Sequence, residues 1–160
     1  MNKARVVSLV VEKLRAEMEA ALQAAREAHE RHTHPESQAR SQYDTFALEA
    51  SYLAHGQSKR VEELKAALAR YLSLPLRSYQ EETPIGLSAL VTLESEEGEK
   101  RHVLLGPSAG GLKVVAEGKT VVLVTPGSPL GEALLSKTVG DSVEVLGERS
   151  SQTFEIVAVQ

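Results

Sequence analysis

The sequence predicts an α+β protein in two parts. An antiparallel coiled-coil hairpin is expected over residues 1–74, followed by a small antiparallel β-sheet domain with one short helix over residues 75–160. The first observation is compositional: 10 of the 11 glycines lie after Pro75, and only Pro35 among the six prolines lies before it. The second is periodicity, because apolar residues follow helical spacing before Pro75 and short alternating runs after it. Pro75 marks the junction because proline discourages continuation of a helix.

Two helices are expected in the first part, which is rich in the helix formers Ala, Glu, Leu, Arg and Gln. Apolar residues at steps of three and four form two stripes, each typical of a helix of roughly 28 residues, about 40 Å long. The first stripe is Val7, Val10, Leu14, Met18, Ala21, Ala25 and Ala28, and the second is Phe46, Ala50, Leu53, Gln57, Val61, Leu64, Leu68 and Tyr71. The polar link at 33–37 favours an antiparallel hairpin.

Short strands are expected in the second part, which is rich in Val, Leu, Thr, Ser and Gly. Glycines such as Gly98 and Gly118 separate apolar runs and indicate turns. The predicted strands are 89–94, 101–106, 112–116, 120–125, 142–146 and 153–159. A short helix is expected at 129–136, where Leu130, Ala133 and Leu134 share a face. Together, these strands and the short helix predict a small α+β unit.

Composition excludes several classes of protein. No cysteine is present, which rules out disulfides and thiolate chemistry, and no apolar run approaches the roughly 20 residues of a membrane helix. We expect no signal peptide, no membrane association and a cytoplasmic location. The net charge of −4 and the 4% aromatic content argue against generic nucleic-acid binding.

Two segments carry a resemblance to a known family. Residues 128–135 are SPLGEALL and residues 139–145 are VGDSVEV, with Lys137 between them. In the first part, Tyr43-Asp44, Glu49-Ala50, Gly56-Gln57 and the RVEEL of residues 60–64 follow a second pattern. The chain resembles the GreA/GreB transcript-cleavage-factor family, in which the first pattern is the C-terminal signature and the second belongs to the returning helix of the hairpin.

The resemblance implies a fold, a partner and a site. The sheet domain would be FKBP-like and would dock at the secondary channel of bacterial RNA polymerase core through Ser128, Pro129, Leu130 and Gly131. The coiled coil would enter the channel as a probe, and nascent RNA or DNA would be met only inside the transcription complex. We expect no cofactor of its own, only Mg²⁺ shared at the polymerase active site, and we favour a monomer over a dimer.

The tip of the hairpin departs from the family pattern. Cleavage-competent members carry D-L-x-E-N-x-E-Y there. Counting back from Tyr43 without a gap places Glu36 at the Asp position, Ala39 at the Glu position and Arg40 at the Asn position, whereas a one-residue gap would place Arg40 at the Glu position. We place Glu36, Arg40 and Asp44 near the shared Mg²⁺. One carboxylate of the acidic pair is missing, and a guanidinium opposes a cation. The resemblance therefore implies a factor that modulates elongation rather than a strong cleavage factor.

Two other functions stay open at this point. A self-association adaptor would need apolar residues outside the hairpin seam, and the candidates are Val6, Val11, Leu48 and Leu72. A metal sensor would use the histidines near the tip, although solvated polar residues near a helix end explain them as well, and we assign no metal site. These residues are His29, His32 and His34, with Glu30 and Glu36.

No enzyme activity is expected. Prolyl isomerisation needs an aromatic-lined apolar pocket, but the second part holds only Tyr79 and Phe154 as aromatic residues. The sheet part also has a single histidine, His102, with no identifiable orienting partner for nucleophilic catalysis.

Overall fold

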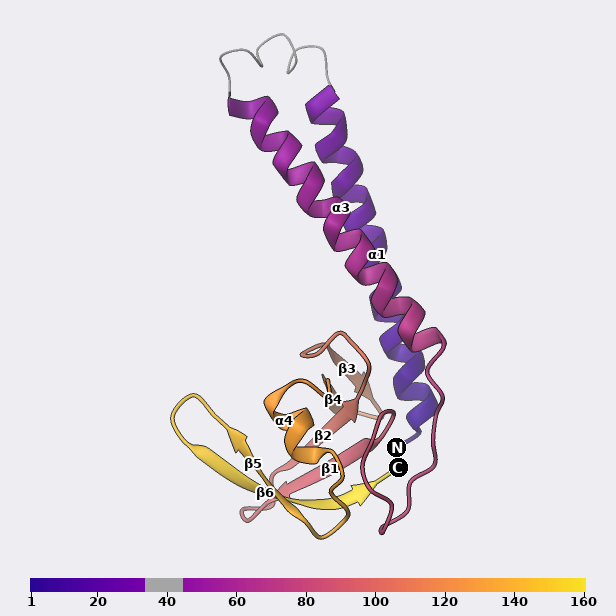
Figure 1. Cartoon of the computed structure of the whole chain (residues 1–160), viewed down its shortest axis with the longest axis vertical. Helices are drawn as coiled ribbons and strands as arrows, with labels where there is room; N and C mark the ends of the chain where they lie inside the picture. The colour runs from indigo at the N-terminus through magenta and orange to yellow at the C-terminus, as the bar shows by residue number, and fades with distance from the viewer. Residues whose placement is uncertain (34–44) are drawn as a thin grey trace. The chain divides into compact units, whose positions relative to one another are not determined.

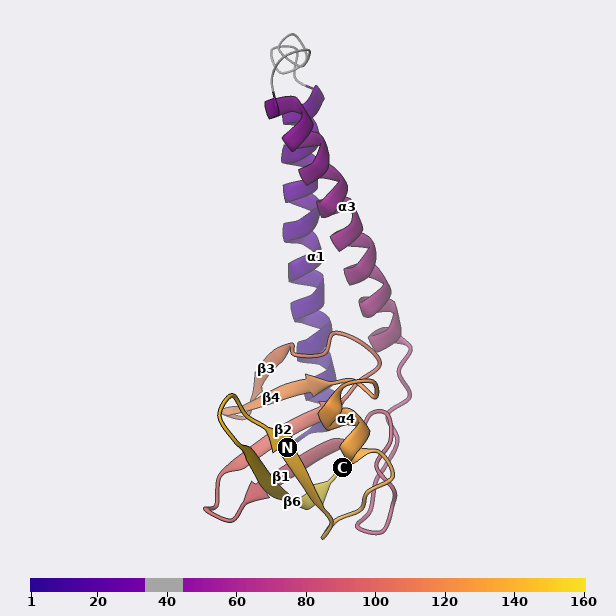
Figure 2. The same cartoon turned by 60° about the vertical axis from the view of Figure 1, so that its left-hand side comes forward.

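The N-terminal part is a pair of long helices. The structure is a computed structural model that describes the backbone of residues 1–33 and 45–160, and the side chains of residues 1–31 and 56–160. Helix α1 spans Lys3–Thr33 and helix α3 spans Thr45–Leu72. Figures 1 and 2 show the two helices running side by side in opposite directions, which confirms the predicted hairpin.

The seam of the hairpin is built from Leu and Ala. Leu14, Ala21 and Ala28 of α1 are buried, as are Leu64 and Leu68 of α3. Alanine lets two helix backbones approach closely, and leucine fills the wider positions between them. The stripe members Phe46, Ala50 and Leu53 lie outside the residues whose side chains are described. Among residues 1–33 and 45–160, no helix is long and apolar enough to cross a membrane.

Six strands form one sheet in the C-terminal part. They are β1 (Leu90–Ser95), β2 (Lys100–Leu105), β3 (Lys113–Ala116), β4 (Lys119–Val124), β5 (Ser142–Leu146) and β6 (Ser151–Val159). Helix α4 spans Pro129–Leu134. The strand order is β3-β4-β2-β1-β6-β5. All six strands and the short helix were predicted within two residues at each end.

The sheet is mixed, because β2 pairs with β4 in parallel. The sequence predicts an antiparallel sheet throughout, and the other four pairings are antiparallel. The difference arises after β2, where the segment 106–112 carries the chain to the sheet edge instead of forming a hairpin. A two-residue turn at Glu117 (φ 51°) and Gly118 (φ 73°) then returns β4 to the gap between β3 and β2.

Both faces of the sheet contribute buried side chains to the core. On the first face, α4 packs through Leu134 onto a cluster that includes Leu93, Val103, Phe154 and Ile156. On the second face Leu104, Val121 and Leu123 are completely buried. The first turns of α1 contribute Val6 and Val10, also completely buried. The central strands, packed on both faces, give a rigid base for the loops at the sheet edge.

The compact units do not divide at Pro75. Residues 1–11 and 70–160 form one unit, and residues 12–69 form the other. Tyr71, in the last turn of α3, belongs to the sheet unit, where its hydroxyl donates a hydrogen bond to the carbonyl oxygen of Ser108 at 2.7 Å. Lys3 donates to the carbonyl oxygen of Arg77 and lies 5.0 Å from the centre of the Tyr79 ring. The division into functional domains at 74/75 stays a prediction.

Candidate docking surface

The SPLG segment forms the start of α4. Ser128 is extended (φ −79°, ψ 154°) and acts as the N-cap. Its Oγ accepts a hydrogen bond from the backbone N–H of Gly131 at 3.1 Å and donates one to the carbonyl oxygen of Thr125 at 2.7 Å. Pro129 occupies the first helical position, where its missing N–H costs nothing and its fixed φ suits the helix. Ser128 and Pro129 thus set where the helix begins.

Gly131 is required by a close backbone approach. A Cβ at this position would lie 1.8 Å from the carbonyl oxygen of Thr125 and 2.7 Å from its carbonyl carbon. Backbone atoms cannot swing away as a side chain can, so any other residue would displace the turn before α4. Ser128 and Gly131 therefore shape the segment, whereas Pro129 is exposed and Leu130 is half-buried.

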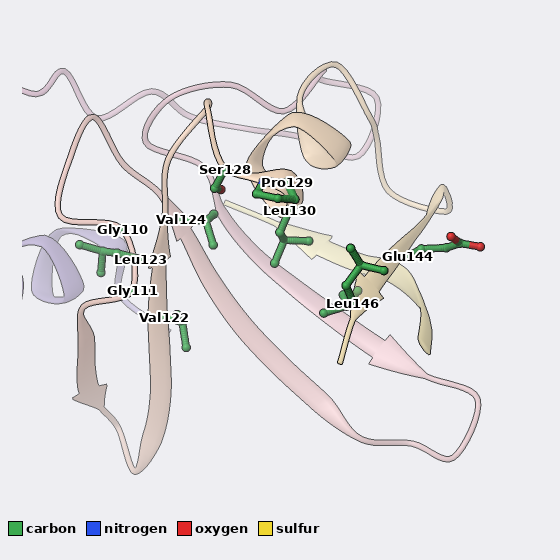
Figure 3. A pocket seen from close by; sticks show the side chains of 11 residues that line it. Gly110, Gly111, Val122, Leu123, Val124, Ser128, Pro129, Leu130, Glu144 and Leu146 are labelled. Atoms are coloured by element: carbon green, nitrogen blue, oxygen red, sulfur yellow. The ribbon is translucent and has the colours of Figure 1, made fainter. Parts of the chain in front are cut away.

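An apolar groove of about 500 Å³ opens beside this segment. Its walls are Gly110–Gly111, Val122–Val124, Ser128–Leu130 and Glu144–Leu146. Figure 3 shows Leu130 reaching into it from α4, Leu146 from β5, and Val122 and Val124 from β4, while the carboxylate of Glu144 extends away. The lining is apolar apart from Ser128 and Glu144.

A second hollow of about 370 Å³ continues the groove. The two share Val122, Val124, Leu130 and Val145. Strands β4 and β5 stand four places apart in the sheet, so they can line one groove only because the sheet curls strongly. The sheet curls but does not close into a barrel. The groove therefore lies between β4 and β5, and α4 covers one end of it.

Charges around the second hollow are largely paired. Lys100 Nζ lies 3.5 Å from a carboxylate oxygen of Glu94, and Arg101 Nε lies 2.9 Å from one of Glu99. The Arg101 guanidinium also lies 4.7 Å from the centre of the Phe154 ring. These contacts neutralise the cations of the hollow locally, so the surface is chiefly a hydrophobic one.

His102 is perturbed by its surroundings. Its Nδ1 lies 3.2 Å from Thr92 Oγ1 across the β1–β2 pair. Partial burial lowers the pKa of the His102 imidazole, and the positive charges of Lys119 and Lys100 lower this pKa further.

Other candidate residues are only partly covered by the structure. The tip residues Glu36, Arg40 and Asp44 lie outside the described residues, as does His34. Within the parts of the chain where side chains are described, no three His, Cys, Asp or Glu residues come together to hold a metal. Of the self-association candidates, Val6 is buried, Val11 is half-buried and Leu72 is 58% exposed, whereas the side chain of Leu48 lies outside those that the structure describes.

The comparison with protein families decides the identity of the chain. Residues 80–160, which contain the whole sheet and the groove, match the family model "Transcription elongation factor, GreA/GreB, C-term". The chain belongs to the GreA/GreB family. This is a family of transcription elongation factors and not of enzymes.

Relatives in this family are distant. The chain is 32% identical over 101 residues to the transcription elongation factor GreA of Thermodesulfovibrio yellowstonii, covering 62% of this chain and 60% of the relative. It is 34% identical over 103 residues to GreA of Rhizobium meliloti, covering 63% and 60%. The matched stretches thus span about 60% of these relatives' length. Among solved structures, the GreA factor homolog 1 (Gfh1) of Thermus thermophilus is similar at 23% identity, with 98% and 93% of the chains covered and a TM-score of 0.40.

Sequence reasoning found one wall of the groove and missed the others. The SPLG segment is contiguous and therefore visible as a motif. Val122, Val145 and Leu146 are far from it in sequence, and their place in the groove depends on how the sheet curls. The high exposure of Leu146, at 76%, is a structural signal that no local pattern carries.

Proposed function

We propose that this chain binds bacterial RNA polymerase core at the secondary channel and modulates transcription elongation. The sheet unit docks, the α1–α3 hairpin acts as the probe, and the chain supplies no catalytic machinery of its own. The observation that carries the proposal is the SPLG segment at the edge of an apolar groove, inside the part of the chain that matches the family. We further propose a monomer acting in the cytoplasm, where the polymerase is.

The groove suits a protein partner. Exposed apolar surface next to a hollow marks an interaction site more often than a chance feature. Ser128 and Gly131 hold the backbone of the segment in place, so Pro129 and Leu130 are presented on a preformed support. A preformed contact loses little conformational entropy on binding.

Weak cleavage stimulation is the second part of the proposal. By sequence, the tip offers Glu36 but has Ala39 and Arg40 where cleavage-competent members carry Glu and Asn. A second Mg²⁺ at the polymerase active site needs hard oxygen ligands, and a nearby guanidinium repels it. We expect occupancy of the channel to slow or bias elongation more than it stimulates hydrolysis of backtracked RNA.

Docking is tested by co-elution with bacterial core RNA polymerase at low salt. Pro129→Asp should weaken the complex by at least about tenfold, because it places a charge against an apolar contact. The fold should survive, since Asp is well tolerated in the first turn of a helix. Pro84→Asp, at an exposed loop position outside the groove, is the matched control. Absence of any complex with the unaltered chain would refute the proposal.

Cleavage is tested on stalled, backtracked complexes. The unaltered chain should add little RNA cleavage over polymerase alone, whereas Ala39→Glu with Arg40→Asn should add cleavage because it restores the acidic pattern. Strong cleavage by the unaltered chain would contradict our interpretation of the tip and leave the docking proposal standing.

A further inference from the structure

Exposed leucines gather where α3 ends and the chain enters the sheet unit. Of the exposed large apolar side chains in the described part of the chain, three belong to this stretch: Leu72 at 58%, Leu76 at 43% and Leu87 at 39%. None of the three lines the groove or its continuation. Figures 1 and 2 both show the segment between α3 and β1 on the side of the sheet unit away from the β5–β6 hairpin. The leucines therefore form a surface separate from the groove.

Hydrogen bonds hold two of these leucines in neighbouring segments. The backbone N–H of Arg77 donates to Ser88 Oγ at 3.0 Å, and the hydroxyl of Tyr79 donates to the carbonyl oxygen of Leu87 at 2.7 Å. The segment that carries Leu76 thus lies beside the one that carries Leu87. Ser88 is completely buried, and its N–H donates to the last carbonyl oxygen of β2 at 2.8 Å. Both leucines are therefore presented on a backbone that is fixed to the sheet.

The charges beside the leucines are positive. Arg70 and Arg77 flank the first two leucines in sequence, and both are exposed. Within the described part of the chain, neither guanidinium forms an ion pair. Lys3 adds a third cation, because its Nζ donates to the carbonyl oxygen of Arg77. Residues 70–80 contain no acidic residue, whereas residues 76–160 as a whole carry 12 acidic and 7 basic side chains.

We propose that Leu72, Leu76 and Leu87 bind an acidic segment of RNA polymerase that carries large apolar side chains. This inference rests on the proposed function and adds a contact that the SPLG segment and its groove do not make. Apolar side chains exposed together mark interaction surfaces. Arginine is favoured at protein interfaces, because its guanidinium can pair with a carboxylate through two hydrogen bonds. Unpaired guanidinium groups beside leucines therefore favour a partner with Asp or Glu next to large apolar residues.

A protein suits this surface better than a nucleic acid does. Nucleic acids are held by many cations along the phosphate backbone and by aromatic rings on which bases stack. Here Tyr71 is buried, and Tyr79 is half-buried with Lys3 Nζ 5.0 Å from the centre of its ring. Leucine has neither a charge for a phosphate nor a ring for a base. The leucines would gain little from a nucleic acid, whereas apolar side chains of a protein would cover them.

The apolar contact is tested by titrating fluorescently labelled factor with core RNA polymerase and following anisotropy. Leu76→Thr should weaken binding about fivefold, because it removes an aliphatic side chain that becomes buried on binding. Val115→Thr is the matched control, since Val115 lies on the edge strand β3 and is 63% exposed. It should bind within twofold of the unaltered chain. Urea unfolding should show that both variants keep the stability of the unaltered chain, as expected for exposed positions.

The charge of the partner is tested by charge reversal. Arg77→Glu should weaken binding about fivefold at low salt, and the difference should shrink as salt is added. Arg149→Glu makes the same change at an exposed position on the β5–β6 turn and should stay within twofold. Tighter binding of Arg77→Glu would show a basic partner and would overturn the inference.

The partner itself is identified by a photo-crosslinking amino acid at position 87. It should link to a polymerase segment that has Asp or Glu next to a large apolar residue, and a link to RNA, DNA or a second copy of this chain would refute the inference. If Leu76→Thr and Arg77→Glu bind as tightly as the unaltered chain while Pro129→Asp is weakened, the inference is wrong and the proposed function stands. If the unaltered chain does not bind at all, the proposed function has failed and the inference fails with it.

Discussion

The absence of a side chain at Gly106 leaves room for the ring of Tyr71, which lies in the last turn of α3. Tyr71 is 2% exposed, and a Cβ on Gly106 would lie 2.0 Å from its hydroxyl oxygen and 2.9 Å from its Cζ. Burial raises the pKa of the Tyr71 hydroxyl, which keeps this group in the protonated form that donates to the Ser108 carbonyl. The last turn of α3 is thereby held in the sheet unit by shape and by one directed bond.

We predict that Gly106→Ala destabilises the chain by about 1–3 kcal/mol, the usual cost of overpacking a buried site. Tyr71→Phe should cost about 1 kcal/mol through the lost hydrogen bond. Because Phe also removes the closest clashing atom, the double variant should be more stable than the sum of the single changes implies. Urea unfolding of the four proteins measures this, and strict additivity would contradict the contact.

His102 makes stability depend on pH. Its folded-state pKa lies below the unfolded value of about 6.5, so the unfolded chain binds more protons between the two values. Stability from this group is complete above about pH 6.5 and is lost as the pH falls toward the folded pKa. We predict that His102→Gln flattens the decline in melting temperature between about pH 7.5 and 5. The other four histidines are common to both proteins. Equal slopes of melting temperature against pH would therefore show that the pKa of His102 does not differ between the folded and unfolded chains.

The helical hairpin is held by its apolar seam rather than by its charges. Leu64 is 3% exposed, whereas the ion pair between Arg60 and Glu17, at 3.3 Å, joins side chains that keep 53% and 34% of their surface exposed. Large-to-small changes in a core cost about 2–5 kcal/mol, and exposed ion pairs contribute about 0–1 kcal/mol. The two kinds of contact can therefore be separated by substitution.

Leu64→Ala should lower the free energy of unfolding by about 2–5 kcal/mol, and Arg60→Ala should change it by less than about 1 kcal/mol. Circular dichroism at 222 nm during thermal unfolding follows the helices directly. A larger effect of Arg60→Ala than of Leu64→Ala would mean that the pairing of α1 and α3 depends on electrostatics.

The elements of the sheet domain were predictable because their signals are local. Alternating apolar residues and turn glycines, such as Gly98 at φ 84° and Gly118 at φ 73°, place the strand ends. The parallel pairing of β2 with β4 was not predictable in this way, since it depends on which edge of the sheet the segment 106–112 reaches. The β5 wall of the groove was missed for the same reason, because Leu146 lines the same groove as Leu130 only through the curl of the whole sheet.

At the scale of the whole molecule, the proposed contacts fall in separate stretches of the chain. The proposed docking contacts are Pro129 and Leu130, and the proposed effect on the transcribing polymerase belongs to the tip that contains Glu36 and Arg40 by sequence. Sites that share no partners usually contribute additively. Separate substitutions should therefore change the affinity for RNA polymerase and the effect on elongation independently.

We predict that Pro129→Asp raises the factor concentration needed for half-maximal effect on elongation by at least about tenfold, while the effect at saturation stays unchanged. Ala39→Glu with Arg40→Asn should do the opposite, changing the effect at saturation and leaving the half-maximal concentration within about twofold. Elongation on stalled and released complexes, titrated with each variant and with the two combined, measures both quantities. A reduced saturating effect for Pro129→Asp would mean that the docking segment takes part in what the probe does, because a mere loss of affinity is overcome by concentration.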